Sequence, residues 1–143
     1  MDIAETIAER SHDAETKVGA LLINNNNQAI IATGFNGFVK GTIDEELPNT
    51  RPEKYEYILH AEMNLLTNCA HHGIAMADCF LVCTLSPCKL CMRLMINSGV
   101  HTVIAKELYR DFPEILQMKD VQVTVFQNIE GFYEIRYKAN QPR

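Results

Sequence analysis

The sequence lacks any apolar run of the roughly 18–20 residues that a membrane-spanning helix needs. Its first six residues, Met-Asp-Ile-Ala-Glu-Thr, also lack the basic region with which a signal peptide begins. We therefore expect a cytoplasmic protein with no membrane partner.

Basic residues are also in short supply, since 13 Lys and Arg face 18 Asp and Glu and leave a formal net charge of −5. Proteins that bind nucleic acids normally present a basic face, so this balance predicts a small-molecule substrate and no nucleic-acid partner. The five cysteines are an odd number in a chain without a secretion signal. They argue against a disulfide framework and favour metal binding together with reduced thiols in the core.

No internal repeat and no linker divides the chain. With 143 residues and 47% hydrophobic content, it has the usual size of one domain and can bury a core. We expect a single domain over residues 1–143.

Two short motifs carry the chemistry, an H-x-E motif at residues 60–62 and a P-C-x-x-C motif at residues 87–91. They supply three candidate zinc ligands, His60, Cys88 and Cys91. Structural zinc sites usually close with four protein ligands, whereas a site with three keeps a position for water. Zinc lowers the pKa of such a water from 15.7 to roughly 7, so the pattern predicts a catalytic zinc site.

Each motif alone has a more ordinary interpretation. A single histidine is more often structural, and a lone C-x-x-C motif can be a redox pair or half of a closed four-cysteine site. A closed site would need a fourth ligand, but Cys79 and Cys83 alternate with Leu81 on one face of a strand, and Cys69 belongs to an apolar helix face. The two motifs together therefore favour the open site, and Glu62, which follows His60 by two residues, is placed to carry protons.

The pattern of apolar residues predicts alternating helices and strands. Helices are expected at 3–9 with Asp2 as its cap, at 61–70, from Pro87 onward with Ser86 as its cap and Cys88 in its first turn, and at 112–118. Strands are expected at 18–23, 29–33, 79–85, 102–105 and 121–126, and the alternation at 132–137 suggests a final edge strand. This order predicts a three-layer α/β/α sandwich with one mixed five-stranded sheet, in which the hairpin is antiparallel and the helix-linked strands are parallel.

Two stretches between these elements are candidates for ligand binding. Residues 34–41 contain three glycines, which allow close approach of a ligand, although a simple turn explains them as well. Residues 42–59 form a long polar stretch that we expect to be an ordered and functional loop. Its basic residues, Arg51 and Lys54, are candidates for holding a phosphate.

The combination of H-x-E and P-C-x-x-C is the known signature of zinc-dependent nucleobase deaminases. On these motifs the chain resembles the cytidine deaminase superfamily and, within it, is most similar to the deoxycytidylate (dCMP) deaminases. The narrower resemblance rests on T-K-V-G-A at 16–20, G-F-N-G at 34–37, H-A-E-M-N at 60–64 and T-L-S-P-C at 84–88, which follow the family's order. Val39 departs from it, because the family typically has proline there.

The resemblance implies the fold of the cytidine deaminases and hydrolytic deamination of dCMP to dUMP and ammonia, which supplies dUMP for thymidylate synthesis. Zinc on His60, Cys88 and Cys91 would present hydroxide to the ring, and Glu62 would transfer the protons. Substrate contacts are implied for Asn36 at the sugar, the Ala61 backbone at the base, and Ser86, Pro87 and Tyr109 in the nucleotide site. Lys17, Gly37, Arg51 and Arg110 are candidate phosphate or effector contacts. The family further implies a homo-oligomer, typically a hexamer, activated by dCTP and inhibited by dTTP.

Two alternatives remain open at this stage. Another deaminase of the superfamily could act on free cytosine, guanine or a tRNA adenosine, although the acidic composition disfavours tRNA. A non-catalytic zinc module could use the same fold for protein interaction. Glu62 argues against the second alternative, because a structural zinc has no use for an uncoordinated carboxylate beside an open position.

Overall fold

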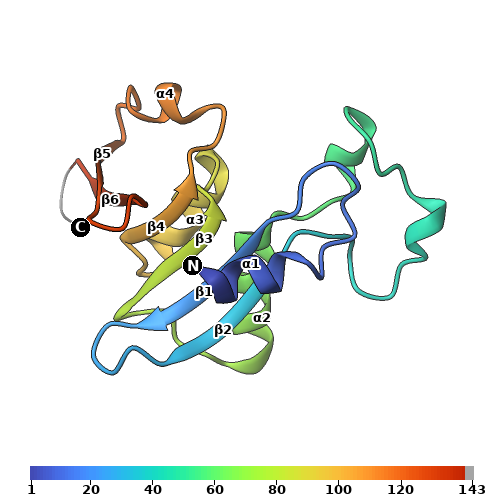
Figure 1. Ribbon diagram of the computed structural model, residues 1–143, viewed down its shortest axis with the longest axis horizontal. Helices are drawn as coiled ribbons and strands as arrows, with labels where there is room; N and C mark the ends of the chain where they lie inside the picture. The colour runs from blue at the N-terminus through green and yellow to red at the C-terminus, as the bar shows by residue number, and fades with distance from the viewer. Residues whose placement is uncertain (141–143) are drawn as a thin grey trace.

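The computed structural model describes residues 1–140, and the last three residues of the expected domain, 141–143, lie outside the described residues. It shows an α/β fold with one mixed sheet, which confirms the predicted class (Figure 1). None of the helices within the described residues has the length and apolar character needed to cross a membrane. In chain order, the elements are α1 (Asp2–Ala8), β1 (Gly19–Asn24), β2 (Ile30–Phe35), the 3₁₀ turns η1 (Asp44–Glu46) and η2 (Glu53–Glu56), α2 (Ala61–His72), β3 (Cys79–Leu85), α3 (Lys89–Asn97), β4 (Thr102–Glu107), α4 (Phe112–Ile115), β5 (Val121–Gln127) and β6 (Tyr133–Ala139).

The sheet has six strands in the order β2-β1-β3-β4-β6-β5, so the predicted number of five is wrong. β6 was expected at an edge, but it lies between β4 and β5. There Ile135 pairs with Val103 on one side and Val125 on the other, and it is completely buried. The β5–β6 hairpin therefore folds back so that β6 lies inside the sheet and β5 forms its edge. β3 and β4, which α3 connects, are parallel as predicted. β5, which follows β4 through α4, is not parallel to it but pairs with β6 in the antiparallel direction.

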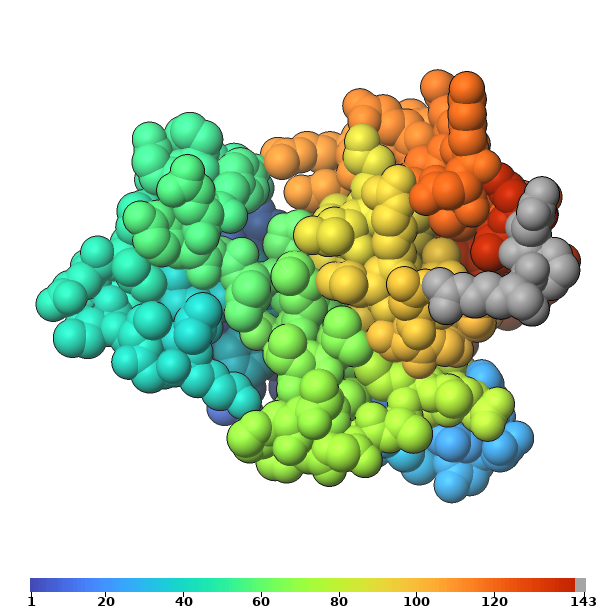
Figure 2. Space-filling model, turned by 180° about the vertical axis from the view of Figure 1, so that it is seen from behind, coloured from blue at the N-terminus to red at the C-terminus, as the bar shows by residue number. Residues whose placement is uncertain are grey.

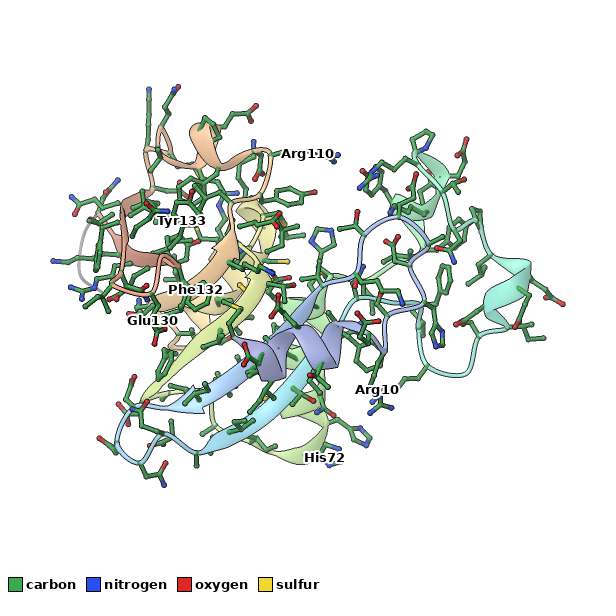
Figure 3. All side chains as sticks on the ribbon, viewed as in Figure 1. Arg10, His72, Arg110, Glu130, Phe132 and Tyr133 are labelled. Carbon is green, nitrogen blue, oxygen red and sulfur yellow. The ribbon has the colours of Figure 1, made fainter. Side chains whose placement is uncertain are left out.

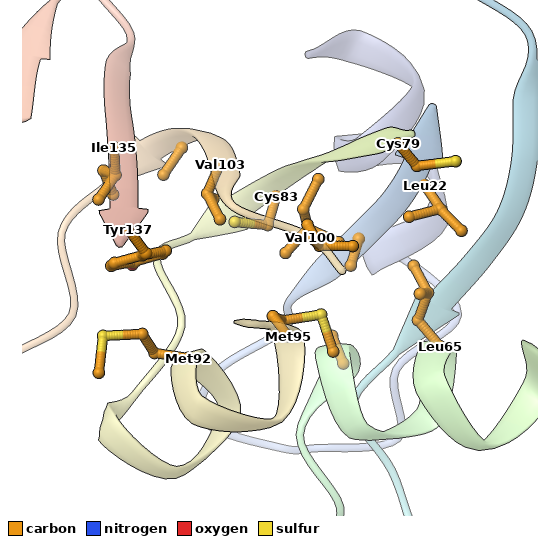
Figure 4. Packing of buried hydrophobic residues seen from close by; sticks show 14 of the residues in the cluster. Leu22, Leu65, Cys79, Cys83, Met92, Met95, Val100, Val103, Ile135 and Tyr137 are labelled. Atoms are coloured by element: carbon orange, nitrogen blue, oxygen red, sulfur yellow. The ribbon is translucent and has the colours of Figure 1, made fainter. Parts of the chain in front are cut away.

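Helices lie on both faces of the sheet. On one face, α2 and α3 cover a core in which Leu65, Met92 and Met95 pack against the strands (Figure 4). On the other face, α1 places Ala4 against Leu21 and Val82. β1 is buried at successive positions because its alternate side chains enter these two cores, as a strand covered on both faces requires.

The first helix differs from its prediction in its cap, and it packs on the sheet through its small residues. Met1 rather than Asp2 occupies the N-cap position, and Asp2 is the first helical residue. The helix buries Ala4 and Ala8, while Ile3 is 52% exposed. Gly19 explains the choice of face, because a Cβ atom there would lie 2.0 Å from the carbonyl oxygen of Ala4. Only small side chains allow the helix to approach β1 so closely.

The other helix boundaries also shift. Cys88 is the N-cap of α3 rather than a residue of its first turn, and the Ser86 hydroxyl does not cap this helix but accepts a hydrogen bond from the Tyr109 amide. α2 extends to His72, beyond the expected end at residue 70. Gly73, in the left-handed conformation, ends the helix. α4 ends at Ile115 and is thus shorter than the expected span of 112–118.

Residues 11–18 and 36–59 form a lobe that projects from one end of the sheet, and we call it the loop lobe (Figure 1). Its two segments are joined by hydrogen bonds from the Ala14 amide to Asn49 and from Asn49 to the His12 carbonyl. The Arg51 amide also donates to the Glu15 carboxylate. The expectation of an ordered loop at 42–59 is therefore confirmed, and this loop includes η1 and η2.

Candidate active site

The three predicted zinc ligands meet where two helices begin. His60 is the N-cap of α2 and Cys88 is the N-cap of α3, with Cys91 one turn further along α3. The ligand atoms of all three lie within 4.8 Å of one another. Helix contacts between α2 and α3 and the parallel strand pair beneath them hold the two motifs together. Within residues 1–140, no other group of three or more His, Cys, Asp or Glu side chains converges in this way.

The geometry of these side chains fits a zinc ion. The Cys91 sulfur lies 3.5 Å from Nδ1 of His60. Tetrahedral zinc with Zn–N of about 2.0–2.1 Å and Zn–S of about 2.3 Å would separate these atoms by about 3.6 Å. One imidazole and two thiolates are ligands that zinc prefers, and three of them leave one coordination position for water or substrate.

The electrostatics of the cysteines also favour a metal site. The hydrogen bond with Cys91, followed by that with His60, lowers the pKa of the Cys88 thiol to about 4. The position of Cys88 at the N-terminus of α3 acts in the same direction. The neighbouring Cys88 raises the pKa of Cys91, so the metal-free pair carries one thiolate readily and a second only when a cation is bound.

Glu62 lies in the first turn of α2, is only 3% exposed and is not a member of the ligand group. Burial, the largest influence, raises the pKa of its carboxyl group to about 7. A carboxyl group with a pKa near the working pH can both accept and donate a proton, which is the property that a general acid–base catalyst needs.

A cavity of about 250 Å³ opens beside these residues, between the loop lobe and the end of the sheet. Figure 2 shows the corresponding hollow between the segment near residue 55 and the segment near residue 110. The loop lobe lines it with Asp13, Thr16, Val18, Asn36, Arg51, Lys54, Tyr55 and Ile58. The remaining lining residues are His60, Ala61, Glu62, Leu85, Ser86, Cys88, Tyr109 and Arg110.

Most of the expected substrate residues line this cavity, but three lie outside it. Lys17 is directed toward Glu9, with which it pairs at 3.8 Å. Pro87 is fully buried, and Gly37 lies in a separate hollow formed by residues 33–45, with its amide bound to the Leu59 carbonyl.

A buried polar network supports the wall of the cavity. The Lys54 ammonium lies 2.8 and 2.9 Å from the two Asp13 carboxylate oxygens, and both side chains are almost fully buried. Burial would raise the pKa of Asp13, but Lys54 and the Thr16 and Glu15 amides outweigh it and hold the pKa below its usual value. The Asn36 amide donates to the Thr16 carbonyl at 2.8 Å and to Asp13 at 3.3 Å, while its oxygen accepts from the Val18 amide. The orientation of Asn36 is thereby fixed.

The opposite wall is positioned by Ser86. Its buried hydroxyl accepts a hydrogen bond of 2.7 Å from the Tyr109 amide, which anchors the turn after β4. The Tyr109 ring then lies 6.2 Å from the His60 ring, between centroids. Ser86 thus places an aromatic side chain beside the predicted zinc ligands.

Sequence reasoning did not identify Tyr55, whose hydroxyl group accepts hydrogen bonds from Arg51 at 2.6 Å and from Arg110 at 2.9 Å. The spacing of four residues between Arg51 and Tyr55 was a weak signal, because it is unremarkable within a polar loop. The involvement of Arg110, which is 55 residues away, could not be read from the sequence.

The fold and the site together define a zinc-binding deaminase domain. The family model for the zinc-binding region of cytidine and deoxycytidylate deaminases matches residues 1–107, and the chain belongs to this family. Within the family, the chain is 34% identical to human deoxycytidylate deaminase over 121 residues. That alignment covers 80% of this chain and 66% of the human protein, so the chain spans just under two thirds of this relative.

Solved structures agree with the family assignment. The structure of dCMP deaminase from cyanophage S-TIM5, in complex with dCMP and dUMP, has a TM-score of 0.68 and 33% identity, and the match covers 81% of this chain and 85% of the phage chain. A diaminohydroxyphosphoribosylaminopyrimidine deaminase/5-amino-6-(5-phosphoribosylamino)uracil reductase from Thermotoga maritima shares the fold, with a TM-score of 0.56 at 24% identity. The match covers 77% of this chain and 29% of that chain.

Proposed function

We propose that this protein is a zinc-dependent enzyme that deaminates dCMP to dUMP and ammonia. The observation that carries the proposal is the buried Glu62 beside an open site of one histidine and two cysteines, at the base of a cavity with arginines at its mouth. The family relationship supports it, since a relative is named deoxycytidylate deaminase and a similar phage enzyme was crystallised with dCMP and dUMP.

The residues divide the chemistry among them. His60, Cys88 and Cys91 would hold zinc, which when bound makes hydroxide available near neutral pH. Glu62 accepts a proton from the attacking water and delivers protons to the ring nitrogen and to the departing ammonia. Its burial keeps solvent away from these transfers. Its raised pKa allows the carboxyl group both to accept and to release a proton near neutral pH.

The cavity accommodates the rest of the nucleotide. In this proposal the base lies against the Ala61 backbone and the Tyr109 ring, with Ser86 holding the tyrosine in place. Asn36 meets the sugar with the free lone pair of its oxygen, because its two amide hydrogens are already bound. Arg51 and Arg110 lie on either side of the mouth, where a 5′-phosphate would emerge.

The decisive substrate comparison is dCMP against deoxycytidine. Loss of a phosphate that binds charged donors should lower kcat/KM by about 10²-fold or more, since hydrogen bonds to charged groups contribute about 1.5–3 kcal/mol each. We expect ammonia release from dCMP to exceed that from cytosine, cytidine, deoxycytidine, dCTP, guanine and adenosine. Equal kcat/KM for dCMP and deoxycytidine, or preference for a free base, would assign the chain to another branch of the family.

The proposal includes a cytoplasmic location, a single domain and a homo-oligomer, with a hexamer as its expected form. Five free cysteines support a reducing compartment. The proposal also includes the three-layer α/β/α sandwich. Its two helical layers would be the short α1 on one face of the sheet and α2 with α3 on the other.

Regulation by dCTP and dTTP is the remaining part of the proposal. The hollow at residues 33–45, which contains Gly37 and Lys40, is separate from the active-site cavity and offers space for an effector. We expect dCTP to raise and dTTP to lower the rate with dCMP about 5–150-fold, the usual range of coupling between two sites. Initial rates with and without each nucleotide measure this, alongside sedimentation for the assembly. Hyperbolic kinetics changed only by competition with dCMP would contradict it.

A further inference from the structure

The mouth of the active-site cavity carries an arginine that is held firmly but has no acidic partner. The Arg110 guanidinium lies 5.3 Å from the centroid of the Tyr55 ring and 5.4 Å from that of Tyr109, and it donates to the Tyr55 oxygen. It forms no ion pair within the described residues, and Asp111 next to it faces the Lys89 amide. Figure 3 shows Arg110 reaching from the turn after β4 toward the loop lobe.

The second arginine approaches the same oxygen from the loop lobe. Arg51 donates through Nε to Tyr55 at 2.6 Å and through its terminal nitrogen to Thr16 at 2.8 Å, and it lies 3.5 Å from Glu15. Its guanidinium is therefore fixed in place on the loop-lobe side of the mouth. Burial would raise the pKa of Tyr55, but Arg110 and Arg51 outweigh it and keep the phenol pKa below its ordinary value.

The charges at the mouth do not balance. Lys54 forms ion pairs with Asp13 and Glu15, and Glu15 also pairs with Arg51. These two carboxylates thus pair with Lys54 and Arg51 but not with the third cation, Arg110. Arg110 has no ion pair within the described residues, and the Tyr55 oxygen is the only oxygen in that part of the chain to which both arginines donate. A phosphate monoester has the charge and the several acceptor oxygens that two converging guanidinium groups recognise.

We propose that Tyr55 is a positioning residue that holds Arg51 and Arg110 together as a two-arginine receptor for the substrate's 5′-phosphate. The phenol joins an arginine of the loop lobe to an arginine of the turn after β4, so it also sets the width of the mouth. This inference rests on the proposed function, of which it specifies the phosphate site and the residue that makes the enzyme select a monophosphate over a nucleoside.

The test is Tyr55→Phe in the zinc-loaded protein, with kcat and KM measured for dCMP and for deoxycytidine. We expect KM for dCMP to rise about 10-fold while kcat stays within about twofold, because one hydrogen-bonding group that orients two charged donors is lost. The kinetics with deoxycytidine, which has no phosphate, should stay within about twofold of the wild type. Tyr57→Phe makes the same chemical change on an exposed ring of the same loop outside the cavity. It should leave kcat and KM unchanged for both substrates.

A second arm uses Arg110→Gln. It should weaken dCMP binding more than Tyr55→Phe does. Adding Tyr55→Phe to it should raise KM by a smaller factor than in the wild type, because only Arg51 is then left for the phenol to orient. Equal losses with dCMP and deoxycytidine would overturn the proposal, since Tyr55 would then support the fold or the base site. An unchanged KM for dCMP in Tyr55→Phe would overturn it as well.

Calorimetric titration with dUMP and with deoxyuridine separates this inference from the proposed function. We expect wild type to bind dUMP at least about 10-fold more tightly than deoxyuridine, and Tyr55→Phe to lose most of that difference. If dCMP is not deaminated but this pattern appears, the proposed reaction is wrong and the phosphate site stands. If dCMP is deaminated but dUMP binds no more tightly than deoxyuridine, the reaction stands and the phosphate site is wrong.

Discussion

Glu62→Gln is expected to keep its zinc and its fold while turnover of dCMP falls by about 10²–10⁴-fold, or by more if one carboxylate serves several proton transfers. The substitution preserves shape and removes the ability to accept a proton. Because Glu62 is not among the converging ligands, metal content should be unaffected. Zinc by atomic absorption and kcat with dCMP, measured on the same preparation, provide the comparison.

Glu130→Gln is the matched control, since it makes the same change on an exposed loop far from the ligands in the chain. It should leave both zinc content and turnover at the wild-type level. Loss of zinc from Glu62→Gln would show that the carboxylate ligates or orients the metal. The division of roles between Glu62 and the three ligands would then be wrong.

Cys88→Ala is expected to abolish both zinc retention and turnover. Removal of one of three protein ligands leaves an imidazole and a single thiolate, and structural and catalytic zinc sites both use at least three protein ligands. The substitution also removes the thiol that hydrogen-bonds with Cys91 and His60. Zinc stoichiometry after dialysis and the rate of dCMP deamination measure the two losses.

Cys69→Ala is the control for loss of a buried thiol. Cys69 lies on the core face of α2, is 1% exposed and belongs to no ligand group within residues 1–140. Its variant should retain one zinc and wild-type turnover, with a modest loss of stability from the small cavity. If Cys88→Ala retains stoichiometric zinc, the metal lies elsewhere.

The convergence of the three candidate zinc ligands could be predicted from the sequence because they belong to two compact motifs whose local geometry is simple. His60 and Glu62 begin one helix, and Cys88 and Cys91 are one turn apart, so each motif largely arranges its own side chains. The parallel pairing of β3 and β4 through α3 was also predictable, since a strand–helix–strand unit has few alternatives.

The features that could not be predicted depend on contacts between distant residues. The place of β6 inside the sheet follows from the fold of the β5–β6 hairpin against β4, which the alternation of 133–139 does not reveal. The Asp13–Lys54 pair and the meeting of Arg51, Tyr55 and Arg110 depend on how the loop lobe packs. Ser86 was expected to cap a helix, but its hydroxyl instead accepts a hydrogen bond from the Tyr109 amide, which lies just after the end of β4.

The most direct test is the reaction of the zinc-loaded wild-type protein with dCMP, followed by chromatographic separation of nucleotides and assay of ammonia. The geometry of Glu62 beside the three ligands predicts that dCMP is converted to dUMP with one ammonia released per dUMP, and that removal of zinc stops the reaction. Persistence of dCMP in the presence of stoichiometric zinc, with no ammonia released, would contradict the proposed activity.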